Sequence, residues 1–208
     1  MDQNQPWSGT AKSSGHFFYT PSRQGVTSCG EIPTNAESFA VRKWLGKYAS
    51  VTTYEISIPV LRDPNLAPPG KTGLIISTLF DYHLIKHIQD QGWYKDFRNL
   101  WEDLSIKVLD NSIYPGLKDS VIHRFSSTPL SIEKITANTH WAITGWAFTN
   151  HPIPAENRLT KIFSATTTPI PGIVQAGQWT YSPSGLPISI LTGKLAADKV
   201  INNLKKRK

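Results

Sequence analysis

The stretch VQAGQWTYSPSGLPISILTGKLAADKVI at 174–201 carries the residues best suited to chemistry, with glycines at 177, 185 and 193 spaced eight apart. A glycine at the end of a strand lets another group approach the backbone closely. Ser184 suits the cap of a helix and Pro187 its first turn, and we expect that helix to run to about Leu204. The free N–H groups at the start of such a helix favour a negatively charged ligand.

This glycine spacing differs from both common nucleotide loops. It is not GxGxxG, and it is not GxxxxGK[ST], because the fifth residue after Gly185 is Ile190 and not glycine. A nucleotide phosphate loop is therefore excluded, whereas an isolated phosphate or a reduced flavin both suit the helix start. A strand, turn and helix that merely pack tightly are equally compatible with the spacing.

The elements around these glycines follow from local patterns. PIPGIVQAGQWT at 169–180 predicts a proline-marked turn followed by a short strand at 173–176. The helix after it carries an apolar stripe and, separately, a face of small residues. Its apolar stripe consists of Ile188, Leu191, Leu195, Ile201 and Leu204. Its small-residue face consists of Gly193, Ala196 and Ala197, which lets another backbone come close.

The rest of the chain predicts an α+β pattern without internal repeats. Residues 1–38 are rich in Ser, Thr, Gly, Asn and Pro and predict an irregular segment with a short strand at 16–20. Apolar spacing or β-branched alternation predicts the remaining elements: a helix at 39–49, strands at 51–61 and 73–82, a helix pair from Leu84 broken at Gly92, a strand at 121–127 and a helix from Thr128-Pro129.

Composition narrows the class of protein. Of 208 residues, 39% are hydrophobic and 18% charged, which is typical of a globular chain. The net charge is +7, and the four basic residues at 205–208 leave only +3 for the rest, so nucleic-acid binding is not expected. That basic tail either complements the negative end of the last helix or contacts anionic lipid.

The location follows from what the sequence does not contain. MDQNQPWSGT at the start has no basic and apolar signal pattern, and no apolar run approaches the roughly 20 residues of a spanning helix. The single cysteine, Cys29, cannot form an intrachain disulfide and is interpreted as a bystander thiol. We expect a cytoplasmic protein, with peripheral membrane contact through the basic tail as the alternative.

Other ionisable residues give no convincing site. His83 and His87 are four residues apart, which places two imidazoles on one helix face, but two ligands do not close a metal site and no HExxH pattern accompanies them. No metal is expected. Glu55, Asp81 and His140 are interpreted as surface or structural residues, so no catalytic residue is assigned.

The segment GIVQAGQWTYSPSGLPISILTGKLAADKVI resembles the carboxyl-terminal flavin-binding segment of the phytoene desaturase and carotenoid isomerase-like family, within the FAD-dependent amine oxidase superfamily. RDPNLAPPGKTGLIIS at 62–77 is similar to the substrate-side sheet of that family, and FSSTPLSIEKITANTHWAITGWAFTN at 125–150 to the segment before its final flavin contacts. The similarity spans roughly 40–204 and is strongest from 120 onward.

The resemblance implies a set of cofactor-binding residues. Gly177 and Gln178 would lie beside the ribityl and pyrophosphate portion of FAD. Trp179 and Tyr181 would be walls of the ring or the substrate, with packing within the protein as the alternative and the commoner outcome for aromatic residues. Gly185, Leu186, Pro187 and Ile188 would border the isoalloxazine ring. The dipole of the following helix would favour the anionic reduced flavin, and Leu186 and Ile188 can donate backbone N–H groups there, whereas Pro187 cannot.

The chain departs from the family at one point. The family opens with a strand, a GxGxxG turn and a helix that hold the ADP half of FAD, and nothing in 1–208 has that pattern. We therefore expect the carboxyl-terminal half of a longer flavoprotein, which alone binds FAD weakly or not at all. A separate FAD-binding chain is the partner this implies.

These inferences predict an α+β fold with a mixed sheet and flanking helices as the substrate domain, plus a strand-turn-helix that would complete an FAD-binding domain. The predicted divisions are 1–38, 39–165 and 166–208. The predicted function is that of an oxidoreductase, with hydride transfer between flavin and an apolar substrate such as an isoprenoid. The alternative is a truncated, non-catalytic fragment that binds an apolar ligand or a partner chain.

Overall fold

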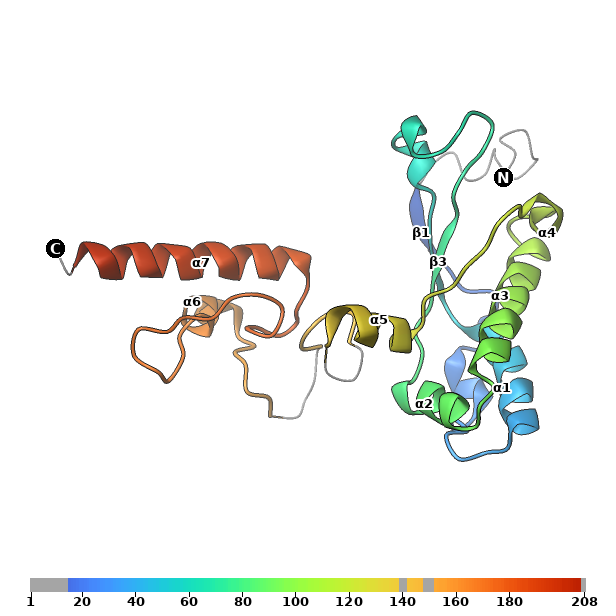
Figure 1. The fold of residues 1–208 in the computed structure, drawn as a ribbon, viewed down its shortest axis with the longest axis horizontal. Helices are drawn as coiled ribbons and strands as arrows, with labels where there is room; N and C mark the ends of the chain where they lie inside the picture. Colours follow the sequence, from blue (N-terminus) through green and yellow to red (C-terminus); the bar gives the residue numbers. More distant parts are fainter. Residues whose placement is uncertain (1–14, 139–141, 148–151, 207–208) are drawn as a thin grey trace. The chain divides into compact units, whose positions relative to one another are not determined.

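The computed structural model describes residues 15–138, 142–147 and 152–206 (Figure 1). The chain forms two compact units, Met1–Ile135 and Thr136–Lys208. Within the described residues, helices accompany one small antiparallel sheet, so the α+β class is confirmed at that level. The predicted divisions at 38 and 165 stay predictions.

The first unit is built around a three-stranded sheet in the order β1-β2-β3. The strands are β1 (His16–Tyr19), β2 (Tyr54–Ser57) and β3 (Ile75–Ser77), and both pairings are antiparallel. The expected mixed sheet is therefore wrong. The segments between the three strands fold as loops, short 3₁₀ turns and the helix α1.

One face of this sheet carries the core of the first unit. Tyr54 and Ile56 alternate with half-exposed residues along β2 and are fully buried. They pack with Ile58 and with three residues from the helical side of the unit: Leu109, Tyr114 and Leu117. The predicted period-2 strand is thus confirmed in its central part, while its end from Pro59 turns into a 3₁₀ helix.

The helices of the first unit follow the predicted apolar spacing. They are α1 (Ser38–Val51), α2 (Tyr82–Asp90), α3 (Tyr94–Asp110), α4 (Leu117–Ser120) and α5 (Pro129–Thr136), with 3₁₀ turns η3 (Val26–Cys29), η4 (Pro59–Leu61) and η5 (Pro64–Leu66). The break at Gly92 is confirmed, because its φ of 79° suits glycine and lies between α2 and α3. Asp81 caps α2 by accepting from the Leu84 N–H at 2.9 Å.

The second unit consists of a long helix over short turns. Its elements are η7 (Leu159–Lys161), α6 (Ile162–Ala165) and α7 (Leu186–Lys205). Figure 1 shows α6 and the loop around it lying along α7. The small core of this unit contains Ile162, Ala165 and Tyr181, against which Ile188 and Leu195 of α7 pack.

The strand predicted at 121–127 is wrong, because side-chain hydrogen bonds hold this segment against α3 in place of a β ladder. The Arg98 guanidinium donates to the carbonyl oxygen of Ser126 at 2.7 Å, and the Ser126 hydroxyl donates to Glu102 at 2.5 Å. Arg124 forms ion pairs with Glu102 and with Asp103. The helix predicted from Thr128-Pro129 is confirmed as α5.

The strand predicted at 173–176 is reduced to a single bridge, in which Thr167 pairs antiparallel with Val174. Glycines with positive φ stand close to both ends of the segment, Gly172 at 81° and Gly177 at 101°. The chain therefore turns before a ladder can lengthen.

Candidate functional site

The second unit brings the two predicted glycine segments together through one side chain of α7. The Gly177 N–H donates to the Thr192 hydroxyl at 3.1 Å, and that hydroxyl donates in turn to the carbonyl oxygen of Ile188 at 2.8 Å. Thr192 is fully buried. The turn at Gly177 is therefore fixed against the first turns of α7, where the resemblance places the flavin edge.

The amino end of α7 has an exposed backbone. Gly185 precedes the helix with a φ of 154°, which L side chains rarely adopt, and its carbonyl oxygen accepts the first helical bond from Ser189 at 2.9 Å. In the described part of the chain, the N–H groups of Leu186 and Ile188 have no acceptor, and the first turn contains no acidic residue. The positive end of the helix dipole is thus not neutralised there.

Ser184 does not cap this helix, so that prediction is wrong. The N-cap position belongs to Gly185, one residue later, which has no side chain to offer. The Ser184 N–H donates to the carbonyl oxygen of Trp146 at 2.7 Å, and the Ser184 hydroxyl is buried without a hydrogen-bond partner among the described residues. That hydroxyl is thus a buried polar group whose hydrogen bond is not made within the described residues.

Residues 145–147 hold the loop between Gly177 and Gly185 from one side. The Trp146 indole N–H donates to the carbonyl oxygen of Trp179 at 3.0 Å, and the two indoles meet edge to face with ring centroids 5.3 Å apart. The Ser182 hydroxyl donates to the carbonyl oxygen of Ala147 at 2.8 Å. We call residues 145–147 the clamp segment.

Gly145 lets the clamp segment approach the loop. A Cβ atom at this position would overlap the carbonyl group of Gln178. The Gln178 side-chain amide donates to Asn138 Oδ1 at 3.1 Å, so its nitrogen is already engaged within the protein. Gln178 therefore has its carbonyl oxygen beside Gly145 and its side-chain nitrogen on Asn138.

Residues 156–158 hold the same loop from the other side. The Ser182 N–H donates to the carbonyl oxygen of Glu156 at 3.0 Å, and the Tyr181 hydroxyl donates to that of Asn157 at 3.1 Å. Tyr181 is only 4% exposed and packs in the core of the unit. Of the two roles expected for this residue, the structure shows packing within the protein, whereas Trp179, at 37% exposed, retains an accessible ring.

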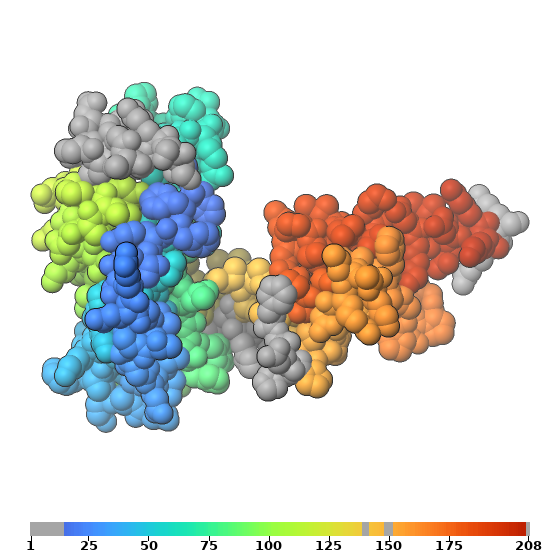
Figure 2. All heavy atoms as spheres, turned by 180° about the vertical axis from the view of Figure 1, so that it is seen from behind, coloured from blue at the N-terminus to red at the C-terminus, as the bar shows by residue number. Residues whose placement is uncertain are grey.

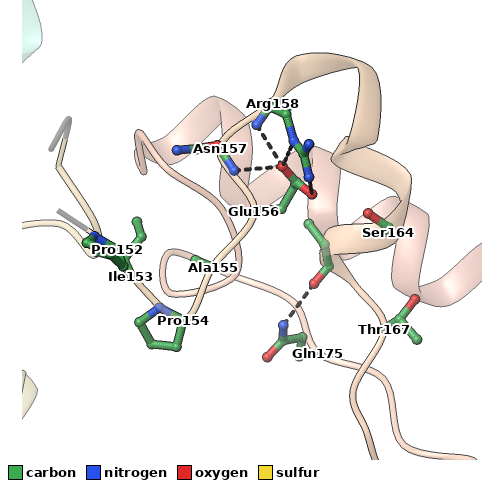
Figure 3. Close-up of a pocket in the computed structure, with 11 residues that line it drawn as sticks. Pro152, Ile153, Pro154, Ala155, Glu156, Asn157, Arg158, Ser164, Thr167 and Gln175 are labelled. Carbon is green, nitrogen blue, oxygen red and sulfur yellow. Dashed lines mark hydrogen bonds and ion pairs between the residues drawn. The ribbon is translucent and has the colours of Figure 1, made fainter. Parts of the chain in front are cut away.

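An open hollow of about 470 Å³ adjoins residues 156–158 (Figure 3). The Arg158 guanidinium donates to Glu156 Oε1 at 3.0 Å, and the backbone N–H groups of Arg158 and Asn157 donate to the same oxygen at 2.9 and 3.1 Å. Hydrogen bonds from the Arg158 side chain and backbone, joined by that from Asn157, lower the pKa of the Glu156 carboxyl to about 2. This carboxylate is a fixed structural anion and not a proton donor near neutral pH.

The residues set aside as non-catalytic have structural contacts where the structure describes them. Glu55 lies 2.8 Å from a His16 ring nitrogen on an exposed pair of strands, and Asp81 caps α2. A His87 ring nitrogen lies 2.7 Å from the carbonyl oxygen of Ala36, and the His83 ring contacts Tyr82. His140 lies outside the described residues, as do the last two residues of the basic tail.

The described residues contain neither a cluster suited to a metal ion nor a helix able to span a membrane. Nowhere in 15–138, 142–147 or 152–206 do three His, Cys, Asp or Glu side chains gather as they would around a metal ion. The helices in those ranges are each too short or too polar to cross a bilayer.

Sequence reasoning missed three residues of this site: Gly145, Trp146 and Thr192. The dipeptide Gly145-Trp146 is a weak signal for a close backbone approach beside an aromatic side chain. Thr192 gave no sequence signal, since the hydroxyl of a threonine in the middle of a helix most often forms a hydrogen bond only with the backbone of its own helix. Comparison with protein-family models, curated proteins and solved structures returned no match to this chain.

Proposed function

We propose that this chain provides the carboxyl-terminal, flavin-contacting part of an FAD-dependent oxidoreductase of the phytoene dehydrogenase-like kind. The amino end of α7 carries the proposal: two backbone N–H groups without acceptors in the described residues, Leu186 and Ile188, follow a glycine with an unusual φ, and no acid stands in the first turn. Such an end suits the electron-rich edge of a reduced flavin.

The surrounding residues fit a flat cofactor. A Cβ atom at Gly177 would meet nothing within 4 Å, so the backbone there has room for a neighbouring group. The half-exposed Trp179 ring offers an aromatic face or edge, held in place by Trp146.

In this proposal the bound flavin supplies hydride transfer to or from an apolar substrate, such as an isoprenoid. The protein's part is to orient and stabilise: Leu186 and Ile188 N–H groups favour negative charge at the flavin edge, and Thr192 keeps the Gly177 turn in register with them. A separate FAD-binding chain is the proposed source of the ADP-holding residues. The basic tail is proposed to contact anionic lipid when the protein lies at a membrane.

The test is flavin absorbance in the visible range. The chain is purified alone and after co-expression with any GxGxxG-containing flavin domain encoded beside it. We expect flavin bands in the co-expressed sample and weak or no bands in the chain alone. Colourless protein in both samples contradicts the proposal and leaves the non-catalytic interaction module as the function.

A negative charge introduced at the start of α7 tests the proposed flavin contact directly. Leu186 is 74% exposed, so Leu186→Glu leaves the core intact and even favours the helix dipole. We expect it to weaken flavin retention and to lower the flavin reduction potential, because the new carboxylate faces the reduced flavin. Leu186→Gln has nearly the same size without the charge and is the matched control. Equal behaviour of the two variants contradicts the proposed contact.

A further inference from the structure

The helix α7 has one face committed to its own unit. Thr192 and Ala196 are buried, and Ile188 and Leu195 pack against the core formed by Ile162, Ala165 and Tyr181. This packing fixes the rotation of α7 about its axis. The opposite face therefore points away from the unit that carries it.

That opposite face is apolar over the length of the helix. We call it the outer stripe; it consists of Leu186, Ile190, Gly193, Ala197, Ile201 and Leu204. The exposed fractions of its four large residues are 74% for Leu186, 66% for Ile190, 49% for Ile201 and 58% for Leu204. In Figure 2, atoms of α7 (red) are in view along most of the helix. Positions three and four residues apart share one helix face, so these side chains form a continuous seam.

The outer stripe is nearly symmetric about its middle. Large aliphatic residues stand at both ends, and the small residues Gly193 and Ala197 stand at the centre, where a Cβ atom at Gly193 would meet nothing within 4 Å. In an antiparallel pair of identical helices, Leu186 meets Leu204 of the second copy and Ile190 meets Ile201. Gly193 then meets Ala197, which allows the two backbones to approach closely at the crossing.

Charges along one edge of the stripe fit the same arrangement. Lys194 and Asp198 form an i,i+4 ion pair at 2.6 Å, and both are largely exposed. The two-fold axis of an antiparallel pair places equal edges of the two helices side by side, so Lys194 faces Asp198 of the second copy. A parallel pair would instead place opposite edges of the two helices side by side, so that Lys194 no longer faces Asp198 of the second copy, and would gather both lysine-rich carboxyl ends.

We propose that the outer stripe pairs antiparallel with the outer stripe of a second copy of this chain. The inference goes beyond the flavin proposal and does not depend on it. The contact is a single helix pair spanning roughly 27 Å, at about 1.5 Å per residue, so the dimer is expected to be weak and dependent on concentration.

Sedimentation equilibrium of the full chain tests this proposal. Over loading concentrations from about 2 to about 200 μM, which bracket a small interface, we expect the apparent mass to rise from monomer towards dimer. Ala197→Glu places a carboxylate at the centre of the seam and should weaken the dimer at least about tenfold, because the charge is desolvated without a partner. Asn202→Glu adds the same charge to the same helix outside the stripe and should leave the dimer unchanged.

A charge exchange tests the antiparallel orientation. Lys194→Glu or Asp198→Lys alone should weaken the dimer, and the double variant should restore it, with helix content checked by circular dichroism for each protein. The proposal is overturned by a monomer at every concentration, by equal effects of Ala197→Glu and Asn202→Glu, or by a monomer that instead co-sediments with phosphatidylserine-containing vesicles. Because mass is the readout here and absorbance the readout for flavin, each proposal can fail without the other.

Discussion

Trp146 and Trp179 are joined twice: their rings meet at an interplanar angle of 89° with centroids 5.3 Å apart, and the Trp146 N–H donates to the carbonyl oxygen of Trp179 at 3.0 Å. Edge-to-face contact directs the positive ring edge at the negative face of its partner. The relationship orients the accessible Trp179 ring relative to the Gly177 turn. The clamp segment thus positions an aromatic group at the candidate site, although it contains none of the predicted site residues.

Gly145→Ala should destabilise the second unit by about 1–3 kcal/mol, the usual cost of overpacking. The added methyl group would overlap the carbonyl group of Gln178, which belongs to the backbone and cannot rotate away. Urea unfolding monitored by tryptophan fluorescence measures the change. Gly73→Ala, where a Cβ atom meets nothing within 4 Å, is the control and should change stability little. Equal stability of Gly145→Ala and the unsubstituted protein would show that the clamp segment is not in this contact.

Thr192→Val should cost about 1–3 kcal/mol, because the Gly177 N–H loses its acceptor in a buried place while the side-chain volume is kept. Thr192→Ser retains the hydroxyl and should lose less. Hydrogen exchange at the Gly177 amide reports the bond directly and should accelerate in Thr192→Val alone. An unchanged exchange rate in that variant would exclude the bond.

The stability of the second unit should fall in acid through Glu156. Its folded pKa of about 2 lies below the ordinary value of 4.5, so the unfolded chain binds more protons between these two pH values. The resulting stabilisation is present above about pH 4.5 and is lost as pH falls towards about 2. Thermal melting at a series of pH values should show this slope in the native protein and a shallower one in Glu156→Gln. Identical slopes would contradict the prediction.

Tyr54 should make the first unit sensitive to alkali. Burial raises the pKa of this phenol, whose hydroxyl donates to the carbonyl oxygen of Ala49 at 2.7 Å. A raised folded pKa means that its stabilising effect is complete below the unfolded value of about 10 and is lost as pH rises above it. Tyr54→Phe should cost about 1 kcal/mol at neutral pH and flatten the alkaline loss. Alkaline unfolding followed by circular dichroism compares the two proteins.

Local patterns predicted the helices well and the strands poorly. The apolar spacing 41, 44, 45 and 48 predicts α1, and there Val41 and Leu45 are buried while Trp44 and Tyr48 are half-buried, because helical periodicity is satisfied within the segment itself. The run at 121–127 is predicted as a strand like β2 but lies in no sheet, and Arg98 and Glu102 form hydrogen bonds with Ser126 in it. Strand formation depends on a partner elsewhere in the chain, which a local pattern does not contain.

The candidate site could likewise be predicted only in part from the sequence. Gly177 and Gly185 could be found from the sequence because positive φ requires glycine at turns and helix starts. Their connection through Thr192 could not, because it depends on the rotation of α7 about its axis. Nor does the sequence distinguish Tyr181, which packs in a buried core, from Trp179, which is 37% exposed, since both are aromatic residues in one loop.

The hydrogen bond from Gly177 to Thr192 also has a mechanical consequence. Thr192 lies in the second turn of α7, and the helix continues from there to Lys205 as one stiff rod. A tilt of the Gly177 turn that preserves this hydrogen bond moves the helix with it, and the displacement grows with distance along the axis. A small movement of the glycine turn therefore becomes a larger movement at the carboxyl end of α7.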